Sequence, residues 1–142
     1  MEMPNVSTES KLLLKITRLY SGTDGESHFE DLPPLPLTPR SSGLHNNVSE
    51  ALDVQQVFFH TYTEQYFNDW HSEEKRYAIL FLTGEQEVEV GDGTKRRFRS
   101  GDLLIAEDLK GRGHRTRGIM PGQSLVCVLQ ESTFQKKVVG IE

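Results

Sequence analysis

The stretch YAILFLTGEQEVEVGDGTKRRFRSGDLLIAEDLKGRGHRTRG, residues 77–118, decides the fold of this 142-residue chain. Apolar runs and period-two alternation of polar and apolar side chains are typical of buried and half-buried strands. They predict four short strands here, at residues 78–82, 85–90, 97–99 and 103–106. Glycine turns separate them, and the Asp92-Gly93 pair is a strong hairpin signal. Such closely spaced strands indicate an antiparallel β-sandwich or barrel.

Strands are also expected on either side of this stretch. Residues 57–63 are rich in β-branched and aromatic side chains, and residues 124–129 form a second apolar run. Residues 11–20 are favoured as a strand over a helix. Alternation places Phe58, His60 and Tyr62 on one face of their strand. Which face points inward is left open by this segment alone.

Residues 54–130 resemble the small single-domain cupins of the RmlC-like superfamily. The resemblance is carried by an apolar strand ending at Gly84, a hairpin, the Gly101-Asp102 turn, another strand and His114. It implies an all-β fold, a single antiparallel jelly-roll β-barrel with an extended N-terminal arm. The ligand pocket of such a protein lies inside the barrel.

Three regions are expected along the chain. Residues 1–10 are polar and predicted to be a frayed tail, residues 11–53 an arm with a proline-rich connection, and residues 54–142 the barrel. The prolines concentrate in residues 33–47, which favours extended coil over an interior strand. The resemblance further implies a homodimer, with the arm packed on a neighbouring protomer.

Composition excludes several classes of partner. The chain has 16 Lys and Arg against 21 Asp and Glu, a net charge of −5, which disfavours nucleic-acid and anionic-membrane binding. The apolar runs are too short to span a membrane. The single cysteine, Cys127, and the polar N-terminal segment without a signal-peptide pattern predict a cytoplasmic protein.

A metal site is one hypothesis. Cupins resembling this chain hold a divalent metal with histidines and a carboxylate, and the matching positions here retain only part of that set. His71 and Glu73 fall near the first two ligands, His114 matches the last, and Tyr77 stands where the carboxylate is expected. Two histidines and one carboxylate form the facial triad of non-haem iron sites, so Fe, Ni, Mn or Zn is the expected metal.

Proton transfer without a metal is the other chemical hypothesis. Some cupin-superfamily epimerases use a histidine base, oriented by a carboxylate, with a tyrosine acid, and both groups suit this work near neutral pH. The expected catalytic residues are therefore His71, Tyr77 and His114. Candidate orienting carboxylates are Asp69, Glu73, Glu107 and Asp108.

Further residues are expected around the ligand, a small molecule in either case. The candidates are aromatic or basic side chains near the pocket and its mouth: His60, Tyr62, Trp70, Lys110 and Arg117. The basic pair would suit an anionic substrate. The sequence thus predicts a small-molecule enzyme, either an isomerase or lyase or a metal-dependent oxygenase. The alternative is a non-catalytic barrel that binds or senses a small molecule.

Overall fold

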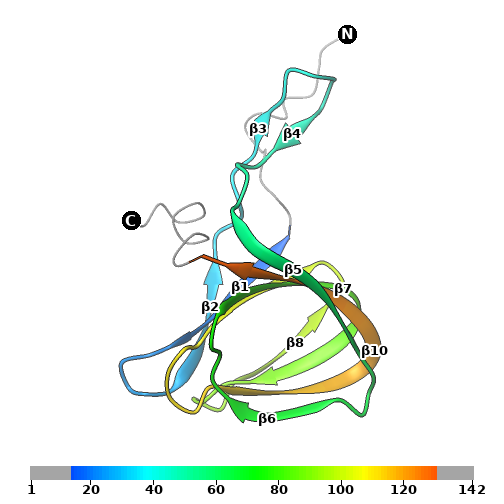
Figure 1. The fold of residues 1–142 in the computed structure, drawn as a ribbon. Helices are drawn as coiled ribbons and strands as arrows, with labels where there is room; N and C mark the ends of the chain where they lie inside the picture. The colour runs from blue at the N-terminus through cyan, green and yellow to red at the C-terminus, as the bar shows by residue number, and fades with distance from the viewer. Residues whose placement is uncertain (1–13, 131–142) are drawn as a thin grey trace.

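The computed structural model describes residues 14–130, and this part of the chain is built from strands and turns (Figure 1). The strands are β1 Lys15–Ser21, β2 Ser27–Leu32, β3 Thr38–Pro39, β4 Asn47–Val48, β5 Val54–Tyr62, β6 Phe67–His71, β7 Arg76–Glu89, β8 Lys95–Arg99, β9 Asp102–Glu107 and β10 His114–Leu129. An all-β fold, as predicted, is confirmed. Across residues 14–130, no helix is long and apolar enough to cross a membrane.

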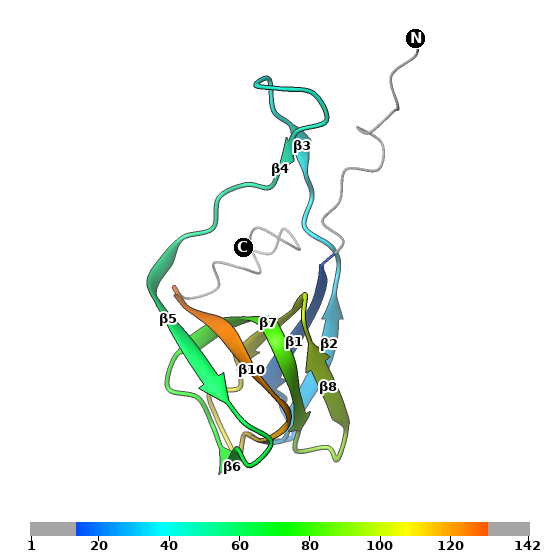
Figure 2. The ribbon, with the colours of Figure 1, turned by 90° about the vertical axis from the view of Figure 1, so that its right-hand side faces the viewer.

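Two layers enclose the interior, and β7 and β10 run through both of them (Figure 2). In the larger layer the order is β2-β1-β9-β7-β10-β5, with the first half of β7 beside the second half of β10. In the smaller layer, β8 pairs with the second half of β7, and β6 pairs with the first half of β10. Two long strands that cross both layers give the sheet a barrel-like form, consistent with the jelly roll that the resemblance implies.

The bend in β7 lies at Gly84. The sequence predicts two strands separated by a turn here, whereas the chain stays in one strand that changes layer. Gly84 has a φ of 80°, and a Cβ at this position would lie 2.5 Å from the carbonyl oxygen of Pro121. Only glycine combines this backbone conformation with so close a contact. The pairing register with β10 also shifts opposite the bend, between Gly118 and Ser124.

One strand pair departs from the predicted antiparallel sheet. β1 lies parallel to β9, and it pairs with β2 on its other side. The sheet is therefore mixed, with one parallel pair among antiparallel ones. β1 covers the edge of β9 that faces away from β7. The barrel thus includes residues 15–32, which the sequence assigns to the arm.

The core fills the space between the layers and also covers the outside of the larger one. Large apolar side chains pack inside the barrel: Leu19, Phe81, Val88, Val90, Phe98 and Leu104. The rings of Phe81 and Phe98 stack with their centroids 5.4 Å apart. A second cluster lies on the outer face and includes Leu35 from the proline-rich segment: Ile16, Leu35, Ala78, Leu103, Ile105 and Leu129. Strand alternation therefore sends odd-numbered residues of β7's first half inward.

Between β2 and β5 the chain leaves the barrel. β3 and β4 form a separate two-stranded hairpin that projects away from the barrel (Figure 1). The predicted extended connection is thus partly paired with itself. Packing of this segment on a second protomer stays a prediction. The edge strand expected near Val138 and Val139 lies outside the described residues.

Candidate functional site

A pocket of about 300 Å³ lies between the two layers of the barrel. Its walls come from inward-facing side chains of β5, β6, β7, β9 and β10. Tyr77 and Ile79 line it from β7, and Phe58 and His60 line it from β5. The alternation in residues 57–63 therefore points the Phe58 and His60 face inward, which leaves Phe59 70% exposed on the outer face.

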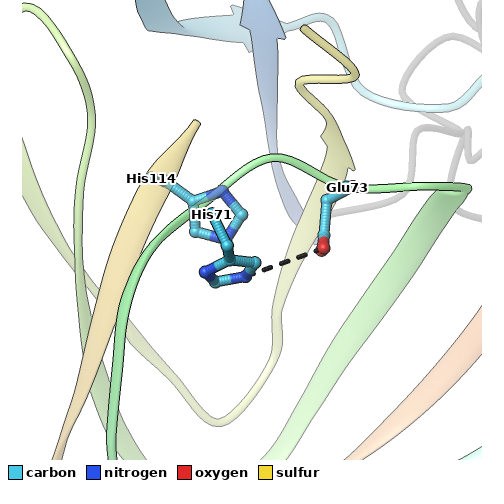
Figure 3. Close-up of side chains that lie close together, drawn as sticks. All are labelled: His71, Glu73 and His114. Atoms are coloured by element: carbon cyan, nitrogen blue, oxygen red, sulfur yellow. Dashed lines mark ion pairs between the residues drawn. The ribbon is translucent and has the colours of Figure 1, made fainter. Parts of the chain in front are cut away.

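His71, Glu73 and His114 meet in this pocket (Figure 3). His71 ends β6 and His114 begins β10, and the two are paired across the strands. Their ring centroids lie 4.4 Å apart. One potential ligand atom from each of the three residues lies within 4.8 Å of the others, and His71 Nε2 lies 3.7 Å from Glu73 Oε1. Segments separated by about forty residues thus bring two imidazoles and a carboxylate together.

Hydrogen bonds at the Nδ1 atoms hold both imidazoles. The Nδ1 atom of His71 lies 2.7 Å from the carbonyl oxygen of Asp69, and that of His114 lies 2.5 Å from Oδ2 of Asp108. Both oxygens accept, so each Nδ1 is the protonated donor. Neutral imidazole then carries its lone pair on Nε2. The two histidines therefore present Nε2 as the atom that binds a metal or takes up a proton.

Asp108 also positions the third residue. Its backbone carbonyl accepts a hydrogen bond of 3.0 Å from the backbone N–H of Glu73. The side chain of Asp108 has no exposed surface, and its second oxygen, Oδ1, has no hydrogen-bond partner in the described structure. One buried aspartate thus fixes both His114 and the turn that carries Glu73.

Gly113 permits the close approach of β10 to β6. Its φ is 77°, and a Cβ at this position would lie 1.8 Å from the carbonyl oxygen of His71. Any other residue would force the two strand ends apart. The loop at residues 107–113, noted in the sequence for its glycines, therefore serves to place His114 beside His71.

Burial changes the protonation behaviour of two groups in the pocket. It raises the pKa of the Glu73 carboxyl, against the opposing effect of the nearby His114 and His71. It also raises the pKa of the Tyr77 phenol, with smaller contributions from Glu73 and Glu74. Tyr77 therefore remains a protonated hydrogen-bond donor at neutral pH.

Only one of the other expected ligand-binding residues lies in the pocket lining. His60 lines the pocket, whereas Tyr62 is buried outside its lining and donates a 2.8 Å hydrogen bond to the carbonyl oxygen of Thr83. The Trp70 ring packs against two guanidinium groups, those of Arg112 at 3.9 Å and Arg115 at 5.0 Å. These positions give Tyr62 and Trp70 structural contacts.

The two basic candidates lie away from the pocket lining. Lys110 is exposed, and its backbone N–H and carbonyl contact the Ser21 hydroxyl. Arg117 pairs with Glu87 at 2.9 Å, beside a shallow hollow on the outer surface of the smaller layer. Neither side chain reaches the cavity that holds His71 and His114.

Five polar pocket residues escape prediction from the sequence: Tyr66, Asn68, Gln86, Thr116 and Ser124. Ser124 alternates with Val126 on β10, so the same alternation that places Val126 inward could have identified it. Gln86 follows the bend at Gly84, where the two-strand interpretation obscured which face points inward.

No protein-family model and no curated protein matches the chain. Solved structures are similar to it. An RmlC-like cupin from Desulfovibrio desulfuricans shares 15% identity, with 91% of this chain and 96% of that one covered and a TM-score of 0.42. An RmlC-like cupin from Shewanella frigidimarina shares 13% identity over 83% and 88% of the two chains, with a TM-score of 0.44.

A third similar structure is a DUF861 family protein from Thermotoga maritima. It shares 23% identity, covers 52% of this chain and 77% of its own, and has a TM-score of 0.41. The solved structures similar to this chain thus include cupins. The likeness is one of fold.

Proposed function

We propose that this protein is a small-molecule enzyme that binds a divalent metal through His71, Glu73 and His114 inside its barrel. The observation that carries the proposal is the convergence of their three potential ligand atoms within 4.8 Å. Atoms that bind one zinc ion lie about 2.0–2.2 Å from it, so separations up to roughly 4 Å fit a common ion. Small side-chain rotations bring the three residues into that range.

The surroundings of the histidines fit a metal. Imidazoles that bind metals generally donate their other N–H to a carboxylate or a backbone carbonyl, which fixes the ring and raises its basicity. His114 donates to Asp108, and His71 donates to the carbonyl of Asp69. The ligand set of two histidines and one carboxylate suits Fe, Ni, Mn or Zn and leaves coordination positions for a substrate.

In this proposal the chain's own residues bind and orient the substrate. A bound divalent metal supplies Lewis acidity or, for iron, redox chemistry. Tyr77, protonated and on the same wall as Ile79, donates a hydrogen bond or a proton to an oxygen of the substrate. The apolar side chains of Phe58, Ile79 and Val126 exclude water from the substrate.

A second candidate is proton transfer without a metal, as in an isomerase or lyase. It is favoured by the buried pair of His114 and Asp108, 2.5 Å apart, with Tyr77 lining the same pocket. In this case His114 Nε2 takes a proton from the substrate while Asp108 stabilises the imidazolium, and Tyr77 returns a proton elsewhere. The non-catalytic binding barrel is the remaining alternative.

Metal analysis of protein purified without a histidine tag tests the metal-dependent function. We expect about one Fe, Ni, Mn or Zn per chain, and loss of the metal in His71→Ala and His114→Ala. His45→Ala is the matched control, because His45 is exposed and lies outside the pocket. Metal far below one per chain after reconstitution with each ion contradicts the proposal and leaves the two metal-free alternatives.

A further inference from the structure

Ser124 carries a buried hydroxyl that has no hydrogen-bond partner among residues 14–130. Its side chain is fully buried and lines the pocket, and its Oγ atom has no hydrogen-bond partner within the described residues. Buried polar groups in native proteins are nearly always hydrogen-bonded, and an exception calls for an explanation such as a bound molecule. Ser124 lies on β10, ten residues beyond His114 along the strand, among the residues that line the cavity.

His60 lies next to Ser124 on the same wall. The two residues are directly paired between β5 and β10. The His60 ring lines the pocket and contacts the rings of Tyr62 at 5.6 Å and Tyr66 at 5.2 Å. Burial lowers the pKa of His60, which keeps its imidazole neutral at neutral pH. A neutral imidazole offers one donor and one acceptor beside the Ser124 hydroxyl.

Charge around this wall is sparse. None of the described residues that line the pocket is Lys or Arg, and its one carboxylate, Glu73, belongs to the His71 and His114 cluster. Apolar side chains separate the polar groups, among them Phe58, Leu104 and Val126. In the metal-free pocket, an anionic group placed beside Ser124 would therefore be buried without a Lys or Arg partner, which is strongly unfavourable.

We propose that Ser124 and His60 form a subsite for an uncharged polar group of the ligand, a hydroxyl, carbonyl or amide carried on a small apolar body. This inference rests on the proposed function in taking the same pocket as the ligand site, and it names the class of substrate. It also replaces the anionic substrate expected from Lys110 and Arg117, because those side chains lie outside the pocket lining. Ser124 is thereby a specificity-determining residue.

The test uses benzyl alcohol, toluene and benzoate as probes on the full chain, both metal-free and metal-loaded. Binding is measured by NMR chemical-shift titration. In the metal-free protein we expect Ser124→Ala to lower the ratio of alcohol to toluene affinity about threefold or more, the effect of losing one hydrogen bond. Thr17→Val is the matched control, because Thr17 is a buried threonine that does not line this pocket, and it should leave the ratio unchanged.

A stability measurement keeps the test independent of any probe. An unpartnered hydroxyl contributes no hydrogen bond to the empty protein, so Ser124→Ala should leave the unfolding midpoint unchanged or raise it. A clear loss of stability would show that the hydroxyl is bonded within the fold and would overturn the inference. So would an unchanged alcohol-to-toluene ratio in Ser124→Ala, or metal-free protein that prefers benzoate over benzyl alcohol.

Metal content measured on the same samples separates the two proposals. Absence of metal with the alcohol preference intact overturns the metal-dependent function and leaves the Ser124 subsite standing. Bound metal with no alcohol preference supports the metal-dependent function and overturns the Ser124 subsite.

Discussion

The Nδ1 atom of His114 lies 2.5 Å from Oδ2 of Asp108, a carboxylate with no exposed surface. Because the acceptor is a buried carboxyl oxygen, the hydrogen bond holds the ring in one tautomer, with Nε2 directed away from Asp108. Asp108 therefore controls a ligand atom without contacting the pocket contents itself.

Asp108→Asn should weaken metal binding about 10- to 100-fold, the usual cost of losing a partner behind a metal ligand. The amide keeps the shape of the side chain but lacks the charge. Competitive titration with a chelating dye measures the affinity. Asp69→Asn is the control, since His71 bonds to the backbone carbonyl of Asp69 and this variant keeps that carbonyl. Equal affinities for the Asp108 variant and wild type would contradict the positioning role.

Gly113→Ala should destabilise the protein more than Gly101→Ala does. Both glycines have a positive φ, 77° and 91°, so each substitution incurs backbone strain of about 1–3 kcal/mol. Only at Gly113 does the added Cβ also collide with a carbonyl oxygen, that of His71, whereas nothing lies within 4 Å of the corresponding position at Gly101. The difference between the two variants in unfolding free energy, measured with urea, gives the destabilisation that the collision adds to the backbone strain. Similar losses in both would show that the strand ends can separate freely.

Tyr62→Phe should lower the free energy of unfolding by about 0.5–1.5 kcal/mol, because it removes the hydrogen bond to the Thr83 carbonyl. Probe binding in the pocket should stay at the wild-type level. Tyr77→Phe should weaken probe binding and change the free energy of unfolding little, since Tyr77 lines the pocket. Reduced probe binding in Tyr62→Phe, with stability intact, would restore Tyr62 as a ligand-binding residue.

His28 should make stability depend on pH. Burial alone would lower the pKa of His28, but hydrogen bonds to Asp24 and Asp92 outweigh it and raise the pKa above 6.5. A raised pKa means that folding favours the protonated ring, so this stabilisation is complete below the unfolded-state pKa and disappears as the pH rises through the folded-state pKa.

The measurement is urea unfolding of wild type and His28→Gln between pH 5.5 and 8.5. The difference in unfolding free energy should be largest at the acid end and shrink above neutral pH. A difference that grows with pH, or stays constant, would show that His28 does not gain a proton on folding.

The strands could be predicted from local pattern because alternation and glycine turns are local signals. The hairpin at Asp92-Gly93 follows from them and is present. Alternation alone left open whether Tyr77 points inward, and the structure places it in the pocket lining. The continuity of β7 through Gly84 could not be foreseen, because a glycine that ends a strand and one that bends it look alike in sequence. The parallel pairing of β1 with β9 depends on how distant segments meet.

The cluster of potential metal ligands could be predicted from the sequence, but the residues around it could not. His71, Glu73 and His114 were expected from the spacing of a resembled motif, and the fold brings them together. Asp108 stood among four candidate carboxylates, since nothing local distinguishes the one whose loop folds back toward His114. Ser124 is chemically ordinary in sequence, and what marks it is burial without a partner in the described part of the chain.

The most direct measurement is an anomalous-scattering map from a crystal of the protein loaded with zinc. Binding through His71, Glu73 and His114 predicts one strong peak about 2.0–2.2 Å from His71 Nε2, His114 Nε2 and a carboxylate oxygen of Glu73. No peak among these three residues in the zinc-loaded crystal, or a peak held by other side chains, would contradict the proposed metal centre.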